Sequence, residues 1–99
     1  LLFMVVARHS AELCPGGTVR PDKEFTAKLE ESMKKSGVKE IAGYTDAPGH
    51  VYYFVVETDD NTALNNAVEP LRLVGEVTIA PVLKFSELVA WAKQIGIQK

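Results

Sequence analysis

Two imidazoles and one thiol are the side chains in this sequence best suited to holding a transition metal. His9 and Cys14, the only cysteine, have four residues between them, and His50, the second histidine, lies near the middle of the chain. Three such ligands with an open position suit a catalytic zinc ion, and a His2Cys set with a weak axial ligand suits copper. We therefore predict a copper or zinc site at His9, Cys14 and His50. Glu12, a water molecule or a residue of a second subunit could be the fourth ligand.

The same residues allow two other readings. A thiolate beside an imidazolium has a lowered pKa and is nucleophilic, so Cys14 with either histidine could serve a metal-free enzyme in covalent or redox chemistry. Asp46 and Glu57 are then the candidates for orienting the base. A lone cysteine can also be a small buried hydrophobe, and histidines at strand ends are often turn residues without chemistry. Whether the protein is an enzyme stays open at this point, and no catalytic residue is assigned.

The composition is that of a small globular domain. The 99 residues are 46% hydrophobic and 24% charged, which predicts one domain over residues 1–99. A net charge of -2 argues against binding to nucleic acid or to an anionic membrane. The apolar run at residues 1–7 is too short to span a bilayer. A single cysteine cannot form an internal disulfide, so we expect a reducing compartment and predict a cytoplasmic protein.

The hydrophobic pattern predicts four strands and three helices. Phe25, Leu29 and Met33 recur every fourth residue in the first helix, which Gly37 ends. The second helix has its cap among residues 59–61 and is ended or kinked by Pro70. Ser86 is expected to cap the last helix, whose apolar stripe is Leu88, Trp91, Ala92 and Ile95. The predicted strands are residues 1–7, 38–45, 50–57 and 76–83.

This order of elements is the βαββαβ pattern of an α+β, ferredoxin-like antiparallel sheet, followed by an extra C-terminal helix. In that fold the strand order is 4-1-3-2, so the first and third strands are antiparallel neighbours. His9 ends one and His50 begins the other, which places both at the same rim. Pairing them also pairs Ala7 with Tyr52 and Val5 with Phe54. The fold therefore predicts the meeting of the two imidazoles, and the Pro-Gly-Gly after Cys14 allows the chain to turn back toward them.

Both faces of this sheet are apolar, although its two helices should cover only one. In strand one the odd-numbered and the even-numbered residues, which point to opposite faces of the sheet, are both apolar, and the same holds for strand three. We therefore expect a second subunit or the C-terminal helix to pack on the open face, with a homodimer as the simplest answer. Trp91 is expected to anchor the C-terminal helix.

Residues 47–57, which read Ala-Pro-Gly-His-Val-Tyr-Tyr-Phe-Val-Val-Glu, and residues 75–82, Gly-Glu-Val-Thr-Ile-Ala-Pro-Val, carry a family resemblance. Over residues 1 to about 84 the chain resembles the dimeric α+β-barrel superfamily. It is most similar there to small prokaryotic domains with a His, a Cys-Pro after strand one and a Pro-x-His before strand three. The resemblance implies a dimer and a small apolar ligand between sheet and helices, in a cavity lined by Val5, Tyr52 and Phe54. Catalytic residues of the isomerases and monooxygenases in that superfamily have no counterpart here.

An RNA-binding role is disfavoured. Tyr52, Tyr53 and Phe54 on the third strand are similar to the stacking aromatics of RNA-recognition modules. The first strand offers no aromatic partner beyond Phe3, and the chain is acidic. Core or dimer packing explains these rings better.

Overall fold

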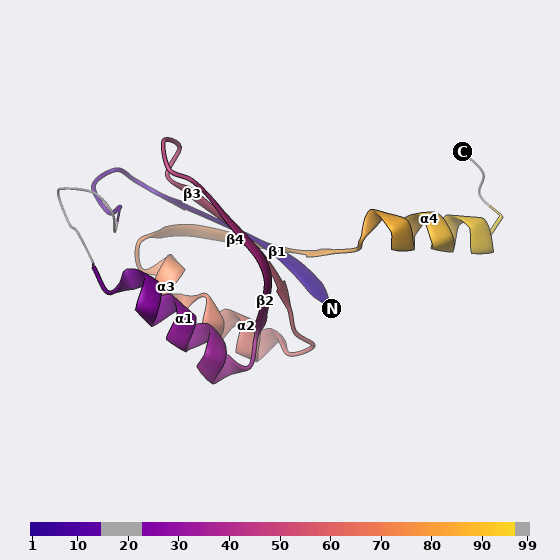
Figure 1. The fold of residues 1–99 in the computed structure, drawn as a ribbon, viewed down its shortest axis with the longest axis horizontal. Helices are drawn as coiled ribbons and strands as arrows, with labels where there is room; N and C mark the ends of the chain where they lie inside the picture. Colours follow the sequence, from indigo (N-terminus) through magenta and orange to yellow (C-terminus); the bar gives the residue numbers. More distant parts are fainter. Residues whose placement is uncertain (15–22, 97–99) are drawn as a thin grey trace.

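The computed structural model describes residues 1–14 and 23–96 of the chain and has an α+β architecture. In chain order its elements are β1 (Leu2–His9), α1 (Phe25–Ser36), β2 (Lys39–Asp46), β3 (Val51–Glu57), α2 (Asn61–Ala67), α3 (Glu69–Arg72), β4 (Gly75–Val82) and α4 (Phe85–Gln94). The four strands form one antiparallel sheet in the order β2-β3-β1-β4, which is the predicted order read from the other edge. The ferredoxin-like arrangement is confirmed (Figure 1).

The register between β1 and β3 is also as predicted. Ala7 lies opposite Tyr52 and Val5 lies opposite Phe54, and the ladder runs from Leu2 to Arg8. Beyond the last pair, the backbone N–H of His9 donates to the carbonyl of His50 over 3.1 Å. His50 itself belongs to the preceding turn, because β3 begins one residue later than the prediction. The central strand pair therefore ends with the two histidines side by side.

The long helix α1 forms as its periodicity predicts. Phe25, Leu29 and Met33 all fall on its buried face. Gly37 ends the helix in the left-handed conformation (φ 72°), and its N–H donates to the carbonyls of the last turn. Of the helices in the described part of the chain, none has the length and apolar character needed to cross a membrane.

Two short helices, α2 and α3, replace the single second helix of the prediction. Asp60 caps α2, since its carboxylate accepts hydrogen bonds from the backbone N–H groups of Thr62 and Ala63 at 2.9 and 3.1 Å. Pro70 lies in the first turn of α3, where its missing N–H costs no helical hydrogen bond. The break at Val68 is thus the interruption expected from this proline.

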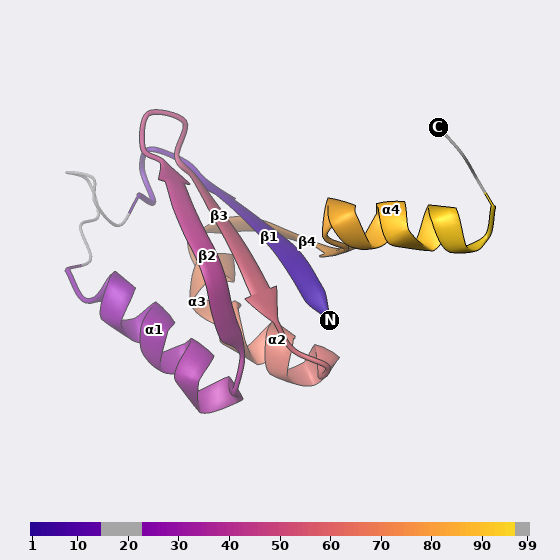
Figure 2. The same ribbon diagram turned by 45° about the vertical axis from the view of Figure 1, so that its right-hand side comes forward.

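One hydrophobic core lies between the sheet and the helices α1, α2 and α3, which all cover the same face (Figures 1 and 2). The side chains that point into it from β1 alternate with others that point to the opposite face. Among the described residues, the core holds no buried polar or charged residue. Its members include Phe3, Val5, Ala7, Val56, Leu64, Ala67, Val68 and Leu71.

The C-terminal helix α4 differs from the prediction in two ways. It begins at Phe85, one residue before Ser86, and its N-cap is Lys84, which makes no side-chain capping bond. Ser86 therefore lies inside the first turn and does not cap the helix. Trp91 does not anchor the helix either, because α4 extends away from the domain and buries no side chain against it (Figures 1 and 2). No helix among residues 1–14 and 23–96 covers the open face of the sheet.

Candidate metal centre

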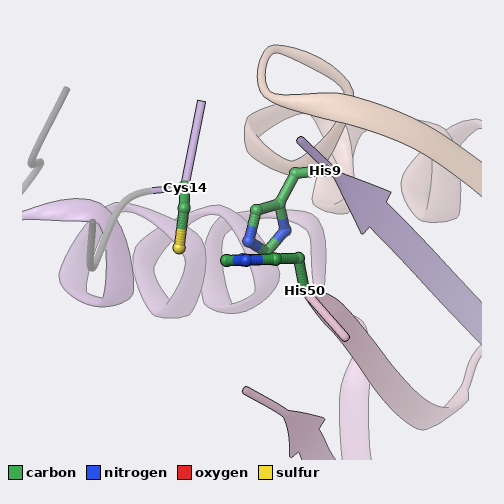
Figure 3. Close-up of side chains that lie close together, drawn as sticks. All are labelled: His9, Cys14 and His50. Carbon is green, nitrogen blue, oxygen red and sulfur yellow. The ribbon is translucent and has the colours of Figure 1, made fainter. Parts of the chain in front are cut away.

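Three donor atoms meet at the rim of the sheet, one each from His9, Cys14 and His50. One imidazole nitrogen of each histidine and the Cys14 sulfur all lie within 4.8 Å of one another. The histidine rings stand edge to face, with 5.2 Å between their centroids and 74° between their planes. Cys14 lies beside both rings (Figure 3). The three residues that the sequence predicted as metal ligands are thus brought together.

A tight turn after β1 brings Cys14 back to the rim. The backbone N–H of Leu13 donates to the carbonyl of Ser10 over 3.2 Å, and the N–H of Cys14 donates to the carbonyl of Ala11 over 3.4 Å. The Ser10 hydroxyl also accepts from the Leu13 N–H at 3.3 Å. Two overlapping turns reverse the chain within the four residues that separate the thiol from His9. The four residues between His9 and Cys14 therefore form a loop that folds back toward the rim.

The second imidazole is held by a strained backbone. His50 has a φ of 56°, and among the described residues it is the one non-glycine residue with positive φ. The hairpin turn before it is fixed by the Asp46 carboxylate, which accepts from the N–H of Gly49 at 3.0 Å. A non-glycine residue in the left-handed region costs about 1–2 kcal/mol. Strain of this kind is typical of functional sites. The sequence pattern gave no sign of it.

The imidazole nitrogens of this cluster are buried without partners. Within the described residues, three buried side-chain nitrogen atoms have no hydrogen bond: Nδ1 and Nε2 of His9 and Nδ1 of His50. Burial lowers the pKa of His9 below its ordinary value, and the charge of His50 lowers it further. His9 is therefore held in its neutral form, which is the form that binds a metal.

The donor set fits a transition metal. Metal bonds of about 2.0–2.3 Å put two ligands of one tetrahedral ion about 3.3–3.8 Å apart, so shifts of about 1 Å would close the cluster around an ion. An ion would take up one imidazole lone pair from each histidine, where a buried nitrogen without a partner otherwise costs about 1–3 kcal/mol. The second ring nitrogen of His9 carries the proton of the neutral imidazole and would not bind the same ion. Glu12 is exposed and lies outside the group of three, so its role as fourth ligand stays a prediction.

The two carboxylates considered as orienting groups do not serve the histidines in this structure. Asp46 binds the N–H of Gly49 in the hairpin turn. Glu57 lies at the end of β3 that is far from the cluster, opposite Leu2 at the start of β1. The hydrogen-bonded carboxylate that would orient a catalytic base is therefore not provided by either residue.

Tyr52 joins the cluster to a cavity under α1. Its ring lies 5.0 Å from the His9 ring and stacks on Phe25 at 6.0 Å. Burial raises the pKa of Tyr52, and the neighbouring charge of Cys14 raises it further. This contact with His9 was not predicted from the sequence, although Tyr52 lies opposite Ala7, and His9 follows Ala7 by two residues on the same face of β1.

The cavity has a volume of about 280 Å³ and lies between α1, β2 and β3. Tyr52 and Phe54 line it, together with Phe25 and Leu29 of α1. Gly43 keeps it open on the β2 side, since a Cβ there would lie 3.1 Å from the Phe54 ring. Val5 is fully buried in the core and does not line this cavity, and the use of these residues by a ligand stays a prediction.

Comparisons with known proteins give a family without an assigned activity. None of the curated proteins matches the chain. The ferredoxin-like fold is consistent with the predicted resemblance, but no match supports the dimeric α+β-barrel superfamily specifically. A family model described as "Domain of unknown function (DUF3303)" matches residues 1–96. The chain therefore belongs to the DUF3303 family.

Proposed function

We propose that the protein binds one transition-metal ion, zinc or copper, through His9, Cys14 and His50. The observation that carries this proposal is the set of buried imidazole nitrogens without partners beside a thiol. In the described part of the chain no other buried side-chain nitrogen or oxygen lacks a hydrogen bond, which makes these atoms exceptional. An ion would supply the interaction that the chain does not.

The ligand set suits either ion. Zinc with three protein ligands keeps a fourth position for water or substrate, and copper accepts a His2Cys set. A water molecule, Glu12 or a residue from a second subunit completes the coordination. Because the thiol must stay reduced to bind, the site fits a reducing compartment such as the cytoplasm.

Titration with Co²⁺ and Zn²⁺ tests the site. We expect one ion per chain and, for Co²⁺, a thiolate-to-metal absorption band. Cys14→Ser should abolish that band. His50→Ala should weaken binding by on the order of 100-fold or more, since loss of an outer-shell partner alone costs about 10–100-fold.

Glu12→Gln tests the fourth ligand, with Glu31→Gln on α1 as the matched control. Equal binding by wild type, Cys14→Ser and His50→Ala would contradict the proposal.

A metal-free Cys14–His pair is the competing function. It requires a thiol that reacts with alkylating agents at unusually low pH in metal-free protein, and loss of that reactivity in either His9→Gln or His50→Ala, depending on which histidine pairs with Cys14. Such a result, with no metal uptake, would replace the metal proposal.

The cavity favours a second candidate function, the binding of a small molecule next to the metal centre. Its lining combines aromatic and aliphatic side chains with polar ones, Glu30 and Glu40 among them, and Tyr52 contacts both the cavity and His9. Phenol, a fragment of suitable size, should shift the NMR signals of Gly43 and Phe54 in a titration. Thr26→Phe, at an exposed lining position, should block these shifts. Shifts confined to residues outside the cavity would contradict this function.

A further inference from the structure

The helix α4 carries an apolar surface that no other described residue of the chain buries. Phe85 is 76% exposed, Leu88 41%, Trp91 51% and Ile95 52%. Leu88, Trp91 and Ile95 follow one another at three and four residues and so form one stripe. No residue of this helix is buried. An amphipathic helix in water requires such a stripe to be packed against another surface.

The open face of the sheet is the second uncovered apolar surface. Leu2, Met4 and Val6 of β1 point to this face and are only half-buried, and Tyr53 of β3 beside them is 37% exposed. Val55 continues the same row on β3. These positions carry no charge. The helices α1, α2 and α3 all lie on the other face (Figure 2).

These two surfaces do not meet within one chain. Only Leu83 and Lys84 separate β4 from α4, and α4 continues outward from the end of the sheet (Figure 1). The radius of gyration is 16.0 Å, whereas a compact chain of about 100 residues has a radius near 13 Å. The extended shape comes from this projecting helix.

We propose that α4 of one copy packs its apolar stripe on the open sheet face of a second copy, and that the second copy returns the same contact. Both complementary surfaces belong to the same chain, so a twofold dimer satisfies both at once. A ten-residue helix is about 15 Å long and covers about three strands spaced 4.8 Å apart, which matches the apolar centre of this sheet. The proposal does not depend on a bound metal.

Trp91 is the chain's only tryptophan, so its fluorescence reports on α4 alone. We expect light scattering to give the mass of a dimer and Trp91 emission to be blue-shifted, as for a buried indole. Leu88→Glu places a charge in the stripe without touching the core. It should weaken dimerisation by at least about tenfold, since a charge is costly to bury, and shift Trp91 emission to the red.

Val6→Glu changes the other surface, far along the chain from the probe. It should also produce monomers and a red shift at Trp91, while Ala27→Glu at an exposed position of α1, of the same added charge, should change neither. Far-UV circular dichroism of Leu88→Glu and Val6→Glu checks that both remain folded.

Three results would overturn the proposal. A dimer whose Trp91 stays solvent-exposed and which is unaffected by Leu88→Glu would show that the sheets pair without α4. A monomer with exposed Trp91 would show that α4 does not dock. A monomer with blue-shifted Trp91 would show that α4 packs on its own sheet.

Discussion

The covered face of the sheet and the rim where His9 and His50 meet differ in whether their buried atoms find partners. On the covered face, side chains such as Val5, Leu64 and Leu71 are completely buried among other apolar groups. At the rim, two half-buried imidazoles hold buried nitrogen atoms that lack hydrogen-bond partners, and one of the two residues has a strained backbone. The buried groups of the core find their contacts within the chain, whereas these nitrogen atoms find none among the described residues. Stability and metal binding should therefore respond to different substitutions.

The largest effect on stability is expected in the core. Leu71→Ala, at a fully buried position, should lower the free energy of unfolding by about 2–5 kcal/mol through lost burial and a residual cavity. Metal affinity of the folded variant should stay within a few-fold of wild type. Denaturant unfolding and metal titration of one preparation measure both. A loss of affinity as large as that of His50→Ala would show that core and rim are not independent.

A smaller effect should expose the strain at the rim. His50→Gly and His50→Ala both remove the ligand, but only glycine adopts a φ of 56° without steric cost. The glycine variant should be more stable than the alanine variant by about 1 kcal/mol, after allowance for its more flexible unfolded state. Urea unfolding of the two metal-free variants gives the difference. Greater stability of His50→Ala would mean that the backbone there is relaxed.

The smallest effect is a pH dependence of the metal-free protein. The pKa of His9 is lowered in the folded state, so the unfolded chain binds more protons as pH falls below about 6.5. The contribution of neutral His9 to the free energy of unfolding is fully present above that pH. It is lost as the pH falls toward the lower pKa that His9 has in the folded state. The melting temperature should fall between pH 7.5 and 5.5, and His9→Gln should reduce that fall. An identical decline in wild type and His9→Gln would rule out His9 as its source.

Much of the candidate site could be predicted from the alternation of apolar residues along the strands and from the strand order alone. A ferredoxin-like order makes β1 and β3 neighbours. The register between them is fixed because the core-facing residues must share one face, namely Val5 and Ala7 with Tyr52 and Phe54, and this register brings His9 and His50 together. The same alternation therefore predicts both the core face of the sheet and the meeting of the two histidines at its rim.

The errors arose where a pattern shows that a face is apolar but does not show what covers it. The stripe of α4 predicted an amphipathic helix correctly, yet Trp91 is half exposed and α4 buries no side chain against the rest of the described residues. Ser86 has a good capping side chain, but the helix starts at Phe85 directly after an extended Lys84.

The left-handed backbone of His50 has no sequence signature, because it is imposed by the hairpin turn.

Metal content per chain tests the central claim most directly. Protein purified without an affinity tag, together with Cys14→Ser prepared in parallel, would be analysed for zinc, copper, nickel and iron before and after reconstitution. We predict close to one zinc or copper ion per wild-type chain and none in Cys14→Ser. Wild-type protein without metal, and with no uptake on reconstitution, would contradict the account.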